Sequence, residues 1–357
     1  MRSAHAKPII GTTDDILPMA RWLLVVAAMV VLIVAIGGIT RLTESGLSIT
    51  QWKPVTGALP PADRCPVAGR VRRLSAHPPQ YIDVNGPAGM TLAQYKFIYF
   101  WEWAHRLLGR LIGLAMIGGT AWFWFKRTIP LGYKARLLAL IALVGLQGTI
   151  GWLMVSSGLS PDALDRVSHY WLAAHLVTAL FTLGGLVWTA LDLYQLSRGQ
   201  PRAGLSRFTL VALAMLGFQL FMGALVAGQR AGQVAGAGLV PAGRLAVDAG
   251  QLCPRGIEWD KGLAHAMFGD PYLSHFIHRW WAWAVVAVLV VMGRRLKAIH
   301  RRDVSVAVHI AFGTQVLLGI ATIWSGVSLW LAVAHQLCGA LLVVATVWGA
   351  HTLSRRG

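Results

Sequence analysis

The stretch Trp22-Leu-Leu-Val-Val-Ala-Ala-Met-Val-Val-Leu-Ile-Val-Ala-Ile36 decides the fold, because it carries no charged side chain. A helix that crosses roughly 30 Å of hydrocarbon needs about 20 mostly apolar residues. Residues 20–40 meet this requirement. We interpret the segment as a retained helix rather than a signal peptide, because Asp14 and Asp15 precede it and no clear small-x-small cleavage site follows.

The composition extends this interpretation to the whole chain. Of 357 residues, 56% are hydrophobic and only 13% are charged, whereas a soluble domain carries roughly 25% charged residues. The mean hydropathy is +0.58. Three Cys cannot supply a disulfide framework, so stability must come from packing. The chain is therefore predicted to be an all-α polytopic membrane protein. Its eight predicted spans are residues 20–40, 96–124, 134–156, 166–190, 207–228, 272–293, 303–324 and 329–352.

Basic residues predict the orientation of these spans. Twelve Lys and Arg occupy the three short connections on one side of the membrane, whereas the short connections on the other side contribute only Arg166. The positive-inside rule then predicts that both termini are cytoplasmic and that the long segments 41–95 and 229–271 face outward. Topology thus explains much of the net charge of +18, and no nucleic-acid partner is expected. The N-terminus does not resemble a mitochondrial transit peptide, which favours a bacterial cytoplasmic (inner) membrane.

The eight spans form a four-helix pattern that occurs twice. Glu102-Trp-Ala-His105-Arg106 in the second span corresponds to His275-Phe-Ile-His278-Arg279 in the sixth. Gln147-Gly-Thr-Ile-Gly151 corresponds to Gln315-Val-Leu-Leu-Gly319, and Trp171-Leu-Ala-Ala-His175 corresponds to Trp330-Leu-Ala-Val-Ala-His335. An even-numbered repeat enters the membrane twice in the same direction. The sequence therefore predicts two tandem four-helix bundles related by pseudo-twofold symmetry, residues 1–195 and residues 196–357.

Four histidines recur at matched positions inside these spans: His105, His175, His278 and His335. Coordinating side chains within a span are costly and are functional candidates by default. Each lies about six to nine residues, or roughly 9–14 Å, from the outward end of its predicted span. Two histidines that face each other in a four-helix bundle can supply both axial ligands of a haem iron. The alternatives are core histidines hydrogen-bonded across helices and zinc, although no span supplies the set of a tetrahedral zinc site.

Further charged residues accompany the histidines. Arg106 and Arg279 directly follow His105 and His278, and their guanidinium groups suit the carboxylates of haem propionates. Arg41 is a weaker candidate of the same kind, as is Lys53. The alternative is local pairing, since Glu102 and Arg106 are spaced i, i+4.

Glu102 distinguishes the two halves, because the matching residue of the second half is His275. A buried carboxylate can transfer a proton or capture an electrophilic carbon. The first bundle is therefore interpreted as catalytic and the second as a permanent cofactor site. The alternative is that Glu102 only pairs with Arg106.

Two stretches carry a resemblance to a known family: Gly37-Gly-Ile-Thr-Arg-Leu-Thr-Glu-Ser-Gly-Leu-Ser-Ile-Thr-Gln-Trp-Lys-Pro-Val-Thr-Gly-Ala-Leu-Pro-Pro61 and Glu102-Trp-Ala-His-Arg-Leu-Leu-Gly-Arg110. Along nearly its whole length the chain resembles the haem A synthases. The resemblance implies oxidation of the C8 methyl of haem O, through a hydroxymethyl group, to the formyl group of haem A for cytochrome c oxidase. It implies that Glu102, His105 and His175 line the substrate site, and that His278 and His335 ligate a permanent haem b.

The cysteines refine this resemblance. One branch of the family has a cysteine pair within its outer loops, whereas this chain has only Cys65 in the first outward loop and Cys253 in the third. It therefore resembles the branch without those pairs, the alphaproteobacterial and mitochondrial type. A Cys65–Cys253 disulfide is left open.

The implied partners are haem O, haem O synthase, cytochrome c oxidase assembly factors, an unidentified electron-transfer partner and membrane lipid. A homo-oligomer is left open. The alternative functions are a di-haem b electron-transfer protein and a haem transporter or chaperone.

Overall fold

The computed structural model describes residues 13–49, 91–159, 167–234 and 257–355, and in these ranges the chain is helical without a β-strand. Four short helices lie at or near the ends of the long ones: η1 (Ser45–Leu47), α8 (Ala231–Val234), η4 (Trp259–Lys261) and α9 (Leu263–Phe268). The long helices are α1 (Thr13–Leu42), α4 (Leu92–Phe125), α5 (Lys134–Gly158), α6 (His169–Leu196), α7 (Arg207–Gly228), α10 (Pro271–Ala298), α11 (Arg302–Trp324) and α12 (Leu329–Ser354).

Each long helix contains a segment long and apolar enough to cross a membrane, and all eight predicted spans are confirmed. The helices extend beyond several predicted ends because polar residues cap them there. Thr91 and Gln94 form a reciprocal capping box at the start of α4. Asp270 accepts hydrogen bonds from the backbone N–H groups of Tyr272 and Leu273, both at 2.9 Å, at the start of α10.

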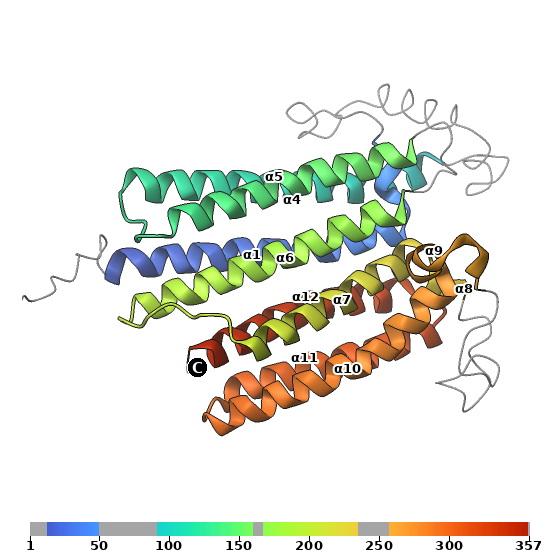
Figure 1. The fold of residues 1–357 in the computed structure, drawn as a ribbon. Coiled ribbons are helices and arrows are strands. Elements are labelled where there is room, and N and C mark those ends of the chain that lie inside the picture. The colour runs from blue at the N-terminus through green and yellow to red at the C-terminus, as the bar shows by residue number, and fades with distance from the viewer. Residues whose placement is uncertain (1–12, 50–90, 160–166, 235–256, 356–357) are drawn as a thin grey trace, which may run out of the picture.

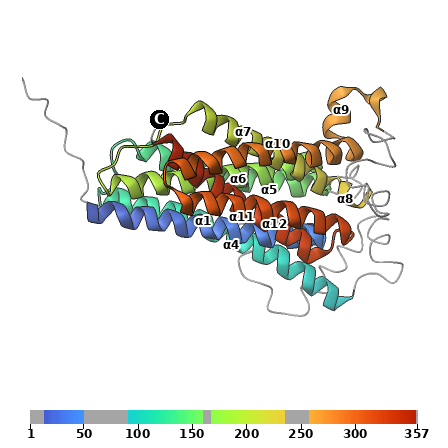
Figure 2. The same ribbon diagram turned by 90° about the horizontal axis from the view of Figure 1, so that it is seen from below.

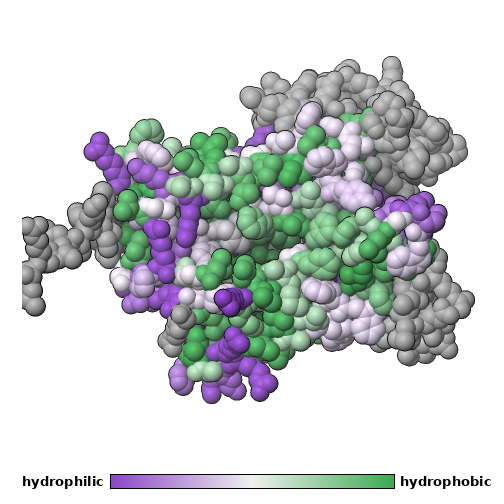
Figure 3. All heavy atoms as spheres, viewed as in Figure 1, coloured by the Kyte–Doolittle hydropathy of each residue, from purple (hydrophilic) through white to green (hydrophobic). Residues whose placement is uncertain are grey.

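The helices are arranged in a long bundle (Figures 1 and 2). In Figure 1, α4 and α5 lie along the upper edge of the bundle, and α10 and α11 lie along the lower edge. Between these edges, α1 and α6 lie next to α4 and α5, and α7 and α12 lie next to α10 and α11. The first turn of α1 and the last turn of α12 lie at the same end of the bundle. We call this the terminus end and the opposite end the site end. Hydrophilic residues gather at the terminus end, and hydrophobic residues cover the middle of the bundle (Figure 3).

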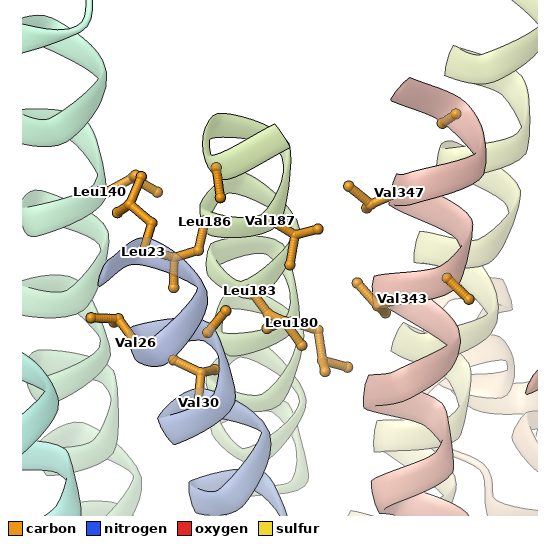
Figure 4. Close-up of a cluster of buried hydrophobic side chains, with 14 of the residues drawn as sticks. Leu23, Val26, Val30, Leu140, Leu180, Leu183, Leu186, Val187, Val343 and Val347 are labelled. Carbon is orange, nitrogen blue, oxygen red and sulfur yellow. The ribbon is translucent and has the colours of Figure 1, made fainter. Parts of the chain in front are cut away.

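Large apolar side chains join the two halves of the sequence. Leu23 of α1 and Leu183 of α6 are fully buried. Figure 4 shows the cluster around them, in which Val343 and Val347 of α12 face α6. A single hydrophobic cluster includes residues from all eight long helices. The division at residues 195 and 196 falls at the last turn of α6, and two separate four-helix units remain a prediction.

A buried acid connects four segments at the terminus end. Asp192 of α6 is 1% exposed and accepts hydrogen bonds from Arg136 Nη1 of α5 (2.5 Å), His351 Nε2 of α12 (2.9 Å) and the backbone N–H of Ala203 (3.1 Å). A carboxylate in an apolar interior is stable only when its oxygens are paired. Asp192 therefore links α5 and α6 to α12 and to the connection that leads into α7.

Replacing Asp192 by Asn should destabilise the protein by about 3 kcal/mol, the lower range for breaking a buried ion pair. The lower value is expected because the Arg136 side chain is 35% exposed and recovers some hydration. Thermal unfolding of the detergent-solubilised protein measures the effect as a lower Tm. Asp260→Asn, which neutralises an exposed acid in η4, is the matched control. Equal Tm values for the two variants would show that Asp192 does not hold the bundle together.

Candidate functional site

The first predicted histidine pair lies between α4 and α6. The ring centroids of His105 and His175 are 6.4 Å apart, and the ring planes are inclined by 54°. Because α4 begins at Leu92, several residues before the predicted span, His105 lies in about the fourth turn of its helix. His175 lies in about the second turn of α6. His105 therefore lies further from the start of its helix than the six to nine residues predicted from the outward end of the span.

The second predicted pair lies on α10 and α12, which pack against each other. His278 and His335 both follow the start of their helices by about two turns. All four predicted histidines are thus near the site end of the bundle, two in each half of the sequence.

Every one of the four rings packs against a glycine of the preceding long helix. A Cβ atom on Gly37 would lie 3.2 Å from His105 Nε2, and one on Gly151 would lie 3.1 Å from His175 Cε1. In the second half, a Cβ on Gly223 would lie 2.7 Å from His278 Cε1, and one on Gly319 would lie 3.0 Å from His335 Cε1. The absence of a side chain at these positions provides the space that the rings occupy.

Glutamines hold the two rings of the second pair. His278 Nδ1 lies 3.1 Å from Gln219 Nε2 and 3.2 Å from the Gln219 carbonyl oxygen. His335 Nε2 lies 3.4 Å from Gln315 Nε2. The Gln219 carbonyl can accept from His278 Nδ1–H, and a bond of this kind orients an imidazole that binds a metal through its other nitrogen. The Gln315 amide nitrogen, in contrast, faces His335 Nε2 as a donor.

The first pair is held differently. Gln147 donates to the main-chain carbonyl of His175 at 3.1 Å and not to its ring. The Nδ1 atom of His175 is buried without a hydrogen-bond partner in the described part of the chain. In the described structure the His175 ring therefore lacks the glutamine contact that the two rings of the second pair have.

Sequence reasoning missed the role of these glutamines, although a signal was present. Gln147, Gln219 and Gln315 each stand four residues before a glycine that packs on a histidine, in the pattern Gln-x-x-x-Gly. The fourth occurrence has Ile33 at the position of the glutamine, before Gly37. The recurrence of this pattern would have identified Gln219.

Glu102 is 3% exposed and lies in a network of hydrogen bonds. Its Oε2 accepts from Ser48 Oγ (2.6 Å) and from the backbone N–H of Ile49 (2.7 Å). Its Oε1 accepts from Arg106 Nη2 (2.5 Å), which also donates to the Ile49 carbonyl (2.9 Å). Glu102 and Arg106 thus attach the segment that follows η1 to α4. The matching residue of the second half, His275, is also buried.

The remaining predicted residues have separate positions. Arg41 donates to the carbonyls of Ala227 (3.3 Å) and Gly228 (3.4 Å) at the end of α7. Arg279 is half-buried in α10, next to His278. The predictions for Lys53, Cys65 and Cys253 lie outside the described residues.

Helix α1 lies between the two sites. Gly37 packs on His105, and a Cβ on the next residue, Gly38, would lie 3.2 Å from the side-chain amide of Gln336. Gln336 directly follows His335 and donates to the Val34 carbonyl of α1 at 2.8 Å. Gly37 therefore contacts a histidine of the first pair, and the next residue, Gly38, contacts the residue that follows a histidine of the second pair.

The spacing of the first pair suits a metal-centred group. With a metal–nitrogen bond of about 2 Å on each side, rings at the observed separation can bind one metal ion between them. Two imidazoles are a known axial ligand set for haem iron. The unpartnered Nδ1 atoms of His175 and His335 leave hydrogen-bonding capacity that a metal-bound imidazole would use.

The fold and the sites define a multi-pass helical membrane protein with two histidine pairs near one end. The family model described as "Cytochrome oxidase assembly protein" matches residues 20–347. The chain therefore belongs to this family, and the predicted resemblance is confirmed.

Its relatives include alphaproteobacterial proteins that bear the name "Heme A synthase". The protein of Novosphingobium aromaticivorans is 59% identical over 98% of this chain and 99% of its own length. The protein of Erythrobacter litoralis is 53% identical over 94% of this chain and 97% of its own length. The protein of Rhodopseudomonas palustris BisB5 is 38% identical over 92% of this chain and 89% of its own length.

Replacing Gly223 by Ala should displace the His278 ring, because the new methyl group would lie 2.7 Å from its Cε1 atom. We expect haem bound at the second site to fall by roughly tenfold, the scale of losses when the support of a metal ligand is disturbed. The haem-to-protein ratio of the purified protein measures this loss. Gly217→Ala in the same helix is the control, because no heavy atom lies within 4 Å of its Cβ position. Equal haem content in both variants would contradict the assigned site.

Proposed function

We propose that the chain is an oxidoreductase that converts haem O to haem A for cytochrome c oxidase. The observation that carries this proposal is the asymmetry of the two sites, since a buried carboxylate, Glu102, stands one turn before His105, whereas His275 takes its place in the second half. The names of the relatives and of the family support the same activity.

In this proposal the first pair binds the substrate. His105 and His175 bind the iron of haem O, and the absence of a glutamine hydrogen bond to the His175 ring in the described structure suits a ligand that must enter and leave. Arg106, Arg279 and Arg41 are the candidate partners of haem propionates, because guanidinium groups bind carboxylates in a planar fork. Arg106 has this role in addition to its bond with Glu102.

The second pair, His278 and His335, holds a permanent haem b. The Gln219 carbonyl beside His278 Nδ1 supports this assignment, since an imidazole oriented through its other nitrogen binds a metal more tightly. When bound, haem b supplies one-electron redox chemistry. The protein contributes the ligands, their orientation and the surrounding charge.

The substrate reaction is the stepwise oxidation of one methyl group. Loss of two electrons and one proton from the C8 methyl leaves a carbocation next to the macrocycle, and water then adds to give the hydroxymethyl group and a second proton. A second two-electron oxidation with addition of water gives a gem-diol, which loses water to form the formyl group. Glu102 stabilises or traps the cation, because a carboxylate held in advance by fixed donors stabilises developing positive charge. An external electron-transfer partner accepts the electrons.

The proposed setting is a bacterial inner membrane with the site end on the periplasmic side. The twelve basic residues of the short connections flank helix ends at the terminus end, which the positive-inside rule assigns to the cytoplasm. Haem O synthase would supply the substrate, and cytochrome c oxidase assembly factors would receive the product.

Replacing Glu102 by Ala or Gln should lower haem A formation by about 10² or more while the haem b content stays at the wild-type level. Ser48→Ala is the matched control, because it removes a hydrogen bond to Glu102 (2.6 Å) and keeps the carboxylate. Haem extracted in acid and resolved by chromatography with mass detection measures substrate, intermediate and product. Full haem A formation by Glu102→Ala would overturn the catalytic role. A loss in Ser48→Ala equal to that in Glu102→Gln would assign Glu102 to anchoring only.

Replacing Gly151 by Ala should impair the first site and leave the second site intact. The new methyl group would lie 3.1 Å from His175 Cε1, so haem O binding and product should decrease while haem b is retained. Gly148→Ala in the same helix is the control, since its Cβ position has no neighbour within 4 Å. The same extraction measures both haems. Loss of haem b together with haem O would contradict the division into substrate and cofactor sites.

The alternative of a di-haem b electron-transfer protein makes a different prediction for the same extraction. It requires haem b at both histidine pairs and neither haem O nor haem A in cells that supply haem O. It also leaves the buried carboxylate of Glu102 without a chemical role.

A further inference from the structure

A second polar site lies at the terminus end, far from the histidine pairs. A pocket of about 220 Å³ is lined by Gln200, Arg301, Thr352 and Arg355. Gln200 belongs to the connection between α6 and α7, Arg301 directly precedes α11, and Thr352 and Arg355 belong to the end of α12. The pocket therefore joins the connection between the two halves of the chain to two helix ends of the second half.

The two arginines are incompletely neutralised. Arg301 donates from Nε (2.9 Å) and Nη2 (2.8 Å) to Asp303, which leaves its Nη1 for another acceptor. Arg355 donates from Nη2 to Gln200 Oε1 at 3.1 Å. The Nε atom of Arg355 is shielded from solvent and has no hydrogen-bond partner in the described structure. Among the residues that the structure describes, two guanidinium groups thus face a single carboxylate, and one charged donor is unsatisfied, which is costly when buried.

Gln200 contributes to the same preference for an anion. Because its Oε1 accepts from Arg355, its side-chain NH2 group is the part left to meet a ligand. Arginine forks and amide donors match the several acceptor oxygens of a phosphate group.

The position of the pocket indicates where such a phosphate is available. The span of α12 ends at Ser354 and that of α11 begins at Arg302, so the pocket lies at the height of a membrane–water interface. Further basic residues flank the same helix ends, and hydrophilic residues gather there (Figure 3). Basic pockets between helix ends at this height are sites for anionic lipid headgroups.

We propose that this pocket binds a phosphate group, with the phosphodiester of an anionic phospholipid as its source. A bound headgroup would neutralise Arg355 and Arg301 and would connect the α6–α7 segment to the end of α12. The ligand chemistry is that of a phosphate oxyanion, and a soluble phosphate would use the same donors.

The test measures lipid retention by native mass spectrometry of the full-length protein. The purified protein is incubated with phosphatidylglycerol or with phosphatidylcholine of the same acyl chains. We expect retention of phosphatidylglycerol in preference to phosphatidylcholine, and about a tenfold weaker retention in Arg355→Gln, the factor for the loss of one charge-assisted hydrogen bond. Arg294→Gln is the matched control, because this exposed arginine lies at the same end of the bundle and does not line the pocket.

A second arm adds inorganic phosphate without lipid. Phosphate binding that depends on Arg355, together with no preference for phosphatidylglycerol, would support the site and identify free phosphate as its ligand. Arg355→Lys keeps the charge and removes the fork, and it should retain less lipid than wild type. Wild-type haem content in each variant shows that the protein is folded. Equal retention of phosphatidylglycerol and equal phosphate binding in wild type, Arg294→Gln and Arg355→Gln would overturn the proposal.

Discussion

The lack of water in the hydrocarbon interior is the constraint on which the rest of this structure depends. A helix satisfies its own backbone there, but each buried polar side chain needs a partner or a ligand. The described helices meet this requirement by collecting polar groups at a few places. Asp192 receives three donors at one end of the bundle, and Glu102 receives three donors toward the other end. The Nδ1 atoms of His175 and His335 are among the buried polar atoms that have no partner in the described structure.

Glycine makes these pairs possible, and small changes of sequence around the glycines make them different. The same packing of ring on glycine occurs four times, but a glutamine precedes that glycine by one turn in three cases and Ile33 in the fourth. Gln219 and Gln315 contact the rings of His278 and His335, whereas Gln147 donates to the main-chain carbonyl of His175. One repeated scaffold thus surrounds the histidines differently in the two halves, and Gly37 and Gly38 of α1 lie between the two pairs.

The features that depend on hydropathy and repetition could be predicted from the sequence, and those that depend on helix rotation could not. Eight spans and the four histidines follow from apolar stretches and matched motifs. The start of α4 lies before the predicted span because a polar capping box of Thr91 and Gln94, which hydropathy does not detect, begins the helix there. The bond between Ser48 and Glu102, and the approach of His351 to Asp192, join residues far apart in the chain. The hydropathy pattern does not predict such contacts, because it does not determine which faces of two helices pack together.

The network around Glu102 favours a chemical role over a purely structural one. A structural anchor for Ser48 and Ile49 needs an acceptor, and a neutral amide would serve at lower desolvation cost than a carboxylate. The second half, with His275 at the matching position, shows that this turn of the scaffold does not require an acid. In the proposed reaction, the donors around Glu102 hold its carboxylate in place in advance, so the site would not have to reorganise when positive charge develops nearby. Because two of those donors come from Ser48 and Ile49, beside the first long loop, the position of that charge depends on how this segment lies over α4.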